Sequence, residues 1–381
     1  MNKYRFIDKF PYLDEKICNS QTGLVTNLFQ WVPEPDDPKI YMIAAKMNKK
    51  DMNGHQVASD LNSAAGFTMR GAYQAAIGET IERYSSSFIH DDIVITSYHQ
   101  LNEKAVNPDK FTFFADDQYG DENFPYEKFT GDTVVGWTRA MSLTNEQIER
   151  VPACCVYLPY IKDKLESNIW DCVSTGLACS ASLEDAILRG IYEVVERDAI
   201  SNMWLNKLSM PQVDISSNAE IYKLFKSKLE VESCNYHFVD ITTDIGIPTY
   251  FGVIEQKGGG ILVSASTNND PIKALKKVML ELSQGRISWK QDIYEGIGVK
   301  EPEKLVEIRD FKSRAKLYTN QYMKKYAEFI YASASDRLVS QNSFFDNGRN
   351  LLKEIVSYFK ENGLEILYVD LTPSEIRRAG Y

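Results

Sequence analysis

The sequence predicts a mixed α/β protein with largely antiparallel sheets, in which three helices of one design line a common site. Strand and helix patterns alternate irregularly along the 381 residues, and strand patterns recur in pairs joined by short polar turns. Neither G-x-x-x-x-G-K-[ST] nor a G-x-G-x-x-G turn leading into a helix occurs. These observations favour antiparallel pairing over a doubly wound Rossmann sheet.

The first half of the chain supplies strands, one long helix and a polar segment. Residues 1–60 mix short apolar runs with the turn-rich stretches "VPEPDDP" and "MNKKDMNG", so we expect them to form an N-terminal strand and loop portion, with the main domain over 61–381. A helix pattern begins at Thr68. Residues 100–135 are polar, aromatic and rich in turn formers, which predicts an insertion or lid. Strand patterns over 133–143 and 149–161 are joined by "TNEQ".

The second half repeats this mixture. A helix begins at Ser182, and residues 235–265 predict three strands, the last two joined in a hairpin at "QKGGGI". A third helix begins at Asp270, with Pro271 at its first position. Residues 310–329 and 348–363 predict two more helices, and 364–372 predicts a closing strand.

Composition excludes several classes of function. The net charge is −10 and no run of Lys or Arg occurs, so a nucleic-acid partner is excluded on electrostatic grounds. The N-terminal "MNKYRFIDKFPYLDEK" lacks the apolar stretch of a signal peptide, and no window resembles a membrane span. We therefore expect a cytoplasmic protein without a membrane partner. The six cysteines contain no C-x-x-C pair and the four histidines are scattered, which favours buried thiols over a zinc site or disulfides.

An internal repeat is the strongest signal in the sequence. Thr68, Ser182 and Asp270 are each suited to cap a helix N-terminus. Each cap is followed after four residues by alanine, after eleven by glutamate and after fourteen by glutamate or glutamine. An arginine follows at once in the first two copies and one residue later in the third. The acidic and amide positions with their arginines are Glu79, Glu82 and Arg83; Glu193, Glu196 and Arg197; and Glu281, Gln284 and Arg286.

The spacing places each pair of acidic or amide groups on one helix face, a turn apart. Buried carboxylates need cations or donors to offset their desolvation. A solvated helix face with local ion pairs explains one copy better than three, and a glycosidase-type carboxylate pair uses only two acids. We favour a polyanionic nucleotide held by magnesium ions between the helices, since Mg²⁺ prefers oxygen ligands and commonly binds with phosphates.

The motifs resemble those of the YcaO family. "AAIGETIERYSS", "STGLACSASLEDAILRGIYEVVERDAI" and "ALKKVMLELSQGRIS" are similar to its three ATP-site helices, over roughly residues 60–290, and "VDLTPSEI" is similar to its C-terminal region. The resemblance implies a YcaO-like catalytic domain with ATP and Mg²⁺ as cofactors. It implies phosphorylation of a peptide amide oxygen, which makes thiazolines or oxazolines from Cys, Ser or Thr in ribosomal peptides such as bacteriocins and thiopeptides.

Site roles follow from the resemblance by position. Metal binding is implied for Glu79, Glu82, Glu193 and Glu196, and ATP binding for Arg83, Ser174, Ser180, Asp185, Arg197, Glu281, Gln284 and Arg286. Ala65 and Ala75 stand where other members have Lys and Ser. The chain ends in "SEIRRAGY" without the Pro-rich tail whose carboxylate is the family's base, so the tail is expected to be missing from this sequence and the base stays unassigned.

The implied partners are the precursor peptide and a separate E1-like (ThiF-like) protein that binds its leader, because no segment here resembles that domain. A flavin-dependent dehydrogenase is a further partner that the family allows. Two alternatives stay open at this stage: a YcaO enzyme that makes a thioamide or amidine with an external nucleophile, and a nucleotide-binding accessory protein without chemistry of its own.

Overall fold

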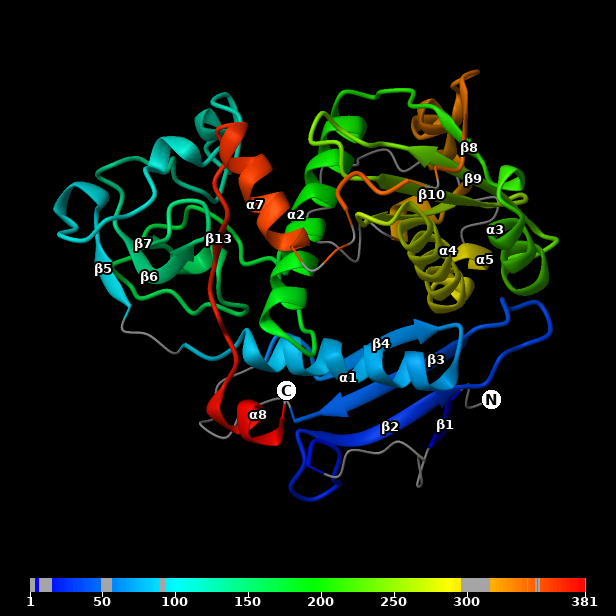
Figure 1. Cartoon of the computed structure of the whole chain (residues 1–381), viewed down its shortest axis with the longest axis horizontal. Helices are drawn as coiled ribbons and strands as arrows, with labels where there is room; N and C mark the ends of the chain where they lie inside the picture. Colours follow the sequence, from blue (N-terminus) through cyan, green and yellow to red (C-terminus); the bar gives the residue numbers. More distant parts are fainter. Residues whose placement is uncertain are drawn as a thin grey trace.

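A computed structural model describes residues 4–6, 16–48, 57–89, 93–295, 316–340, 342–346, 348 and 350–380. Figure 1 shows its helices and strands arranged as three β-sheets with helices between and beside them. The predicted class, mixed α/β with mainly antiparallel sheets, is confirmed. Within the described residues, no helix is long and apolar enough to cross a membrane.

The N-terminal sheet carries the first long helix. Its antiparallel strands are β1 (Tyr4–Phe6), β2 (Val25–Trp31), β3 (Tyr41–Met47) and β4 (Leu61–Gly66), in that order. Helix α1 (Met69–Ser85) packs on β3 and β4. Its fully buried Ala72 and Ala76 bring the helix close to the sheet. Gly66 ends β4 so near α1 that a Cβ there would lie 2.4 Å from Ala72 N, which explains the glycine.

The central sheet carries the other two repeated helices. It has the order β11 (Ile261–Thr267), β10 (Thr249–Gln256), β9 (Cys234–Asp240), β8 (Gln212–Asp214) and β12 (Asp336–Leu338), antiparallel except for β8 and β12. The predicted hairpin is present, with Gly258 at φ +76° in its turn. Helices α2 (Leu183–Leu205) and α4 (Pro271–Ser288) both pack on β10 and β11.

The third sheet holds the predicted strand pair of residues 133–161. It comprises β13 (Leu367–Tyr368), β6 (Val135–Ser142), β5 (Val94–Thr96) and β7 (Gln147–Pro152). Phe111 and Phe129 of the 100–135 segment pack against Trp137 of β6. The segment contains two short 3₁₀ helices, η2 (Pro108–Lys110) and η3 (Gln118–Gly120), and a third, η1 (Tyr98–Gln100), lies where it begins. Its identity as an insertion or lid stays a prediction.

Smaller elements complete the described chain. They are η4 (Ala153–Cys155), η5 (Ile215–Ser217), α3 (Ala219–Leu224), η6 (Phe225–Leu229), α5 (Lys290–Glu295), η7 (Gln321–Tyr326), η8 (Glu328–Tyr331), α7 (Leu351–Glu361) and α8 (Ser374–Ala379). Helix α7 lies within the predicted 348–363 helix.

Three predicted elements are wrong in part. The 149–161 strand stops at Pro152, whose missing N–H ends the ladder, so Cys155 is exposed on a 3₁₀ turn while Cys154 is buried. The 310–329 helix is wrong in most of its described part, because the Asn320 amide bonds back to backbone carbonyls at 3.0–3.1 Å and 3₁₀ helices follow. Residues 310–315 lie outside the described residues. The closing strand shortens to two residues before Asp370 forms a side-chain turn.

The cysteines are all free thiols, as predicted. Cys18, Cys154 and Cys234 are buried, Cys172 and Cys179 are half-buried, and Cys155 is exposed, so the predicted burial holds in full for three of the six.

Candidate active site

Side-chain caps fix the registers of the three repeated helices. The Thr68 hydroxyl accepts a hydrogen bond from the amide three residues on at 3.1 Å, and the Ser182 hydroxyl does the same at 3.2 Å. The Asp270 carboxylate accepts from the amides two and three residues on, at 3.0 and 3.2 Å. Each cap is the predicted one, so the first glutamate of every stripe lies in its third full turn.

The α1 acidic pair is partly neutralised on its own helix. Arg83 Nη2 lies 2.7 Å from Glu79 Oε1, and Arg83 Nη1 lies 3.3 Å from Glu82 Oε1. The Glu82 side chain is 14% exposed. Burial raises the pKa of Glu82 to about 8; Glu79 and Glu193 add to this rise and Arg83 opposes it. One arginine therefore does not satisfy both carboxylates.

The α2 pair is deeper still. Glu196 is 7% exposed, and its Oε2 accepts a hydrogen bond from Thr267 N of β11 at 3.3 Å. Burial raises the pKa of Glu196 to about 7, with Glu281 and Glu193 contributing in the same direction. Burial likewise raises the pKa of Glu193. Arg197 lies 3.9 Å from Glu196 and is half exposed, so its compensation is weak.

The α4 stripe contributes one carboxylate and a cation that sequence reasoning missed. Glu281 Oε2 accepts a hydrogen bond from the Ser264 hydroxyl of β11 at 2.8 Å, and Lys277 Nζ lies 3.5 Å from Glu281 Oε1. Burial lowers the pKa of Lys277, but Glu281, Glu196 and Glu193 outweigh it and raise the pKa overall. The Lys277–Glu281 spacing of four residues was the only signal in the sequence that could have singled out this lysine.

The carboxylates of the three helices lie close enough to act on one another electrostatically. Glu193 of α2 raises the pKa of Glu82 on α1, and Glu281 of α4 raises that of Glu196 on α2, so each helix acts electrostatically on another. Five carboxylates stand against three cations, which leaves two formal negative charges. The five acids are Glu79, Glu82, Glu193, Glu196 and Glu281, and the cations are Arg83, Arg197 and Lys277. A divalent cation, which prefers oxygen ligands, would supply the missing positive charge.

The loop before α2 joins the α1 and α2 stripes. Gly190 of α2 packs against this loop so closely that a Cβ would lie 2.8 Å from Gly176 O. Cys179 packs on the α1 core, and burial together with Glu82 raises its pKa to about 11. The predicted Ser174 forms a backbone turn of this loop, and Ser180, next to Cys179, is half-buried.

Asp185 lies at the N-terminal end of the α2 stripe. It is exposed, and its Oδ2 accepts a hydrogen bond from the Ser182 hydroxyl at 3.0 Å. A cavity of about 670 Å³ opens here, between the first turns of α2, α4 and α7. Its lining residues are Ser182, Glu184, Asp185, Leu188, Lys273, Gly348 and Leu351. Among the predicted ATP-binding residues, Asp185 is thus the one that lines this cavity.

Gln284 and Arg286 face other groups than the glutamates. Gln284 Nε2 donates to Ser63 O of β4 at 2.9 Å, which ties α4 to the N-terminal sheet. Arg286 is fully buried, and its Nη2 lies 3.4 Å from the Tyr294 hydroxyl and 3.7 Å from Asp36 Oδ2. Glu281 and Arg286 project about 140° apart around the helix axis. The ATP-binding roles of Gln284 and Arg286 stay predictions.

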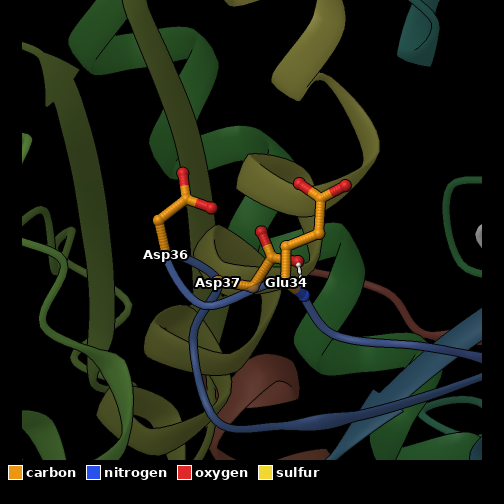
Figure 2. A group of neighbouring side chains, drawn as sticks. All are labelled: Glu34, Asp36 and Asp37. Atoms are coloured by element: carbon orange, nitrogen blue, oxygen red, sulfur yellow. Dashed lines mark hydrogen bonds between the residues drawn. The ribbon is translucent and has the colours of Figure 1, made fainter.

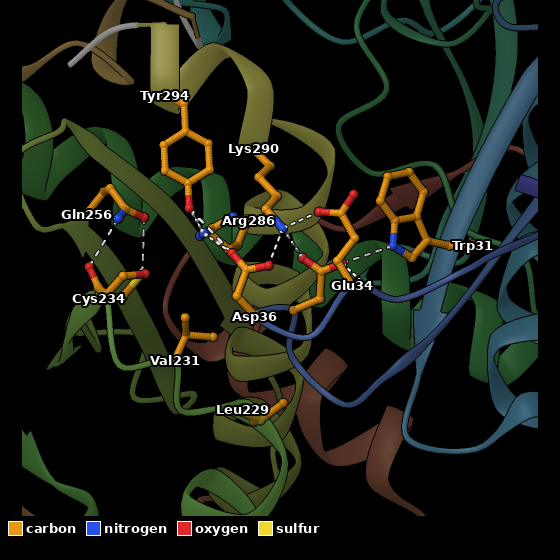
Figure 3. A network of polar contacts seen from close by, with 12 residues as sticks. Trp31, Glu34, Asp36, Leu229, Val231, Cys234, Gln256, Arg286, Lys290 and Tyr294 are labelled. Atoms are coloured by element: carbon orange, nitrogen blue, oxygen red, sulfur yellow. Dashed lines mark hydrogen bonds and ion pairs between the residues drawn. The ribbon is translucent and has the colours of Figure 1, made fainter. Parts of the chain in front are cut away.

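A second acidic group lies in the β2–β3 loop. Glu34, Asp36 and Asp37 bring carboxylate oxygens within 4.8 Å of one another (Figure 2). Sequence reasoning treated this stretch, "VPEPDDP", as a loop only. The Lys290 ammonium occupies the space between the three carboxylates, so the group is an ion-pair cluster (Figure 3).

Partly buried carboxylates with too few cations, on three capped helices, are typical of a protein that binds divalent metal ions. A family model described as YcaO cyclodehydratase, ATP- and Mg²⁺-binding, matches residues 63–379. The chain therefore belongs to the YcaO family, and ATP and Mg²⁺ are its cofactors.

Solved structures share the fold at low sequence identity. A heterocyclase in complex with substrate and cofactor matches with TM-score 0.75 and 21% identity, covering 93% of this chain and 48% of that one. YcaO from Methanopyrus kandleri bound with AMPPCP and Mg²⁺ matches with TM-score 0.64 and 17% identity, covering 92% and 82%. The E. coli microcin synthetase McbBCD complex matches with TM-score 0.60 and 17% identity, covering 90% and 83%. This chain spans about half of the first heterocyclase.

Proposed function

We propose that this protein is an ATP-dependent cyclodehydratase that converts Cys residues of a ribosomal precursor peptide to azolines, with Ser and Thr as chemically related substrates. One observation carries the proposal: in a YcaO-family chain, partly buried carboxylates from three helices lie close enough to shift one another's pKa values, and they outnumber the nearby cations by two. Such a site suits Mg²⁺ bound together with a triphosphate.

The metal ligands in this proposal are Glu79 and Glu82 on α1 and Glu193 and Glu196 on α2. Bound Mg²⁺ supplies charge neutralisation for the phosphates. Arg83 keeps its two carboxylates turned toward each other, through contacts of 2.7 and 3.3 Å. The nucleotide would extend along the α2 stripe toward Asp185, with Ser174, Ser180, Arg197, Glu281 and Gln284 as the remaining proposed ATP-binding residues.

The proposed reaction removes one water from the peptide. The Cys thiol adds to the carbonyl carbon of the preceding residue and gives up its proton, and the carbonyl oxygen takes the γ-phosphoryl group of ATP. Phosphate then leaves as the nitrogen loses its proton and the C=N bond forms. The peptide is dehydrated, and ATP becomes ADP and phosphate. Positioning and charge neutralisation carry most of the catalysis in such phosphoryl transfer.

The precursor peptide and a separate E1-like protein that binds its leader are the proposed partners. The heterocyclase that this chain matches is about twice as long, and the E. coli relative is part of a multiprotein synthetase complex. In this proposal the leader-binding function is supplied to this chain by a second polypeptide. A flavin-dependent dehydrogenase acting on the azoline is the further proposed partner.

The decisive experiment incubates the chain with ATP, Mg²⁺, a Cys-containing precursor peptide and its leader-binding partner, and measures peptide mass and phosphate release. We expect loss of one water for each phosphate released, and neither change with Glu193→Gln. Replacement of oxygen by sulfur would identify thioamide formation instead. ATP binding without peptide-dependent phosphate release would identify an accessory protein, and turnover by Glu193→Gln at the wild-type rate would remove the site assignment.

A further inference from the structure

A partly buried ion-pair cluster joins the start of α5, directly after α4, to the β2–β3 loop. Lys290 Nζ lies 2.5 Å from Glu34 Oε2, 2.5 Å from Asp36 Oδ1 and 3.1 Å from Asp37 Oδ1. The Lys290 side chain is 7% exposed and that of Asp37 is fully buried. Figure 3 shows the ammonium pointing from the start of α5 into the acidic loop. The cluster links residues that are more than 250 positions apart in sequence.

Arg286 extends the cluster by one helical turn. Its Nη2 lies 3.7 Å from the second oxygen of Asp36, and the Tyr294 hydroxyl also lies 3.4 Å from that oxygen. The guanidinium lies 5.6 Å from the centre of the Tyr294 ring. Asp36 therefore contacts Lys290 with one oxygen and faces Arg286 with the other.

The acidic loop is already fully engaged by groups of the protein. Asp37 Oδ2 accepts hydrogen bonds from Trp31 Nε1 at 3.3 Å and from Glu34 N at 2.8 Å. A metal ion has no place between carboxylates that surround an ammonium. Apolar contacts would hold the two segments together without the cost of desolvating charged groups. In a charged cluster each group must meet its partners at short range, which favours one relative geometry of the two segments. The cluster is therefore suited to fixing a geometry.

The geometry in question is that of the metal site. Its carboxylates are divided between α1, which packs on the N-terminal sheet, and α2 and α4, which pack on the central sheet. Helix α4 spans this division, because Gln284 Nε2 donates to Ser63 O of β4 and the cluster holds the next turns to the β2–β3 loop. Gln284 lies two residues before Arg286 and three after Glu281. A shift of the cluster would thus move Gln284 and Glu281 relative to α1.

We propose that Lys290, Arg286 and Asp36 form a positioning device that acts through Gln284 and holds α4 in register with α1 for nucleotide binding. The inference rests on the proposed function of the same site. It makes Arg286 a positioning residue, held to the N-terminal loop, in place of the direct ATP contact that its motif predicts. A displacement of about 1 Å at a reacting site can change rates by as much as a hundredfold, so such a device is consequential.

The test is a double-variant cycle of Asp36→Asn and Gln284→Ala, read as the Kd of AMPPNP with Mg²⁺ by calorimetry. The Asp36 side chain is 46% exposed. In Asp36→Asn, Lys290 keeps its two other carboxylates, while the fully buried Arg286 loses its ion-pair partner and keeps the Tyr294 hydroxyl at 3.4 Å. We expect each single variant to raise Kd about tenfold, and the double variant to match Gln284→Ala alone. Asp36→Glu should restore most of the affinity.

Controls separate this inference from the function on which it rests. Lys226→Met breaks an exposed ion pair to Glu230 and should leave Kd unchanged. Independent, multiplying effects of Asp36→Asn and Gln284→Ala on Kd would overturn the positioning role while leaving the nucleotide site in place. An unchanged Kd in Asp36→Asn would do the same. Failure of the wild-type protein to bind AMPPNP with Mg²⁺ would overturn the proposed function itself.

Discussion

Replacing Glu196 by glutamine should stabilise the metal-free protein while abolishing its ATP turnover. Glu196 is 7% exposed, and burial raises its pKa from 4.5 to about 7. Between these pH values the folded protein keeps a proton that the unfolded chain has released. Stability contributed by this group therefore falls as pH rises, and the loss is complete a little above pH 7. Glutamine stays neutral and escapes the loss.

The magnitude follows from the shift. A change of one pKa unit corresponds to about 1.4 kcal/mol, so a carboxyl group moved from 4.5 to about 7 destabilises the folded state at pH 8 by about 3 kcal/mol. The glutamine oxygen can still accept the 3.3 Å hydrogen bond from Thr267 N. The gain in Glu196→Gln should therefore be about 3 kcal/mol at pH 8 and close to zero at about pH 4.5.

Urea unfolding in EDTA from about pH 5 to pH 8 measures this difference. Excess Mg²⁺ and ATP should then stabilise the wild type and not the variant. Glu361→Gln, a replacement at the exposed end of α7, is the control and should stay within about 0.5 kcal/mol of wild type at every pH. A difference between Glu196→Gln and wild type that does not grow with pH would refute the reasoning.

Three further predictions concern the same site. Binding of ATP with Mg²⁺ should tighten from about pH 6 to about pH 8, because Glu82 and Glu196 must lose protons. Calorimetry in buffers of different ionisation enthalpy should detect this proton release, and binding without proton release would contradict the raised pKa values. The Lys277→Met variant should bind Mg²⁺ in the absence of ATP several-fold more tightly than the wild type, because it removes a cation that lies 3.5 Å from Glu281. Weaker Mg²⁺ binding in a metal titration would exclude competition between Lys277 and the metal ion. Gly190→Val should lower the free energy of unfolding in urea by about 1–3 kcal/mol, because its Cβ would lie 2.8 Å from Gly176 O. Gly285→Ala, where a Cβ meets nothing within 4 Å, should not lower it. Equal effects of the two replacements would show that the loop at Gly176 moves to accommodate the side chain.

Local chemistry made much of the fold predictable. The caps Thr68, Ser182 and Asp270 accept hydrogen bonds from amides two or three residues away. The hairpin turn requires only the positive φ that Gly258 adopts. Two predicted elements end earlier than expected, because a residue at the point where each ends disfavours its continuation. Asn320 bonds its amide to the preceding turn, and Pro152 lacks the N–H that a longer strand needs.

The sequence by itself determined which residues share a helix face, because cap position and the helical period fix the glutamate stripes from one end of each helix. Only the tertiary structure decided what those stripes meet. It brought Lys277 among the glutamates, turned Arg286 toward Asp36 and set Lys290 between acids more than 250 residues away. These contacts depend on how separate sheets pack, and charge acts over a few ångströms in space regardless of distance along the chain.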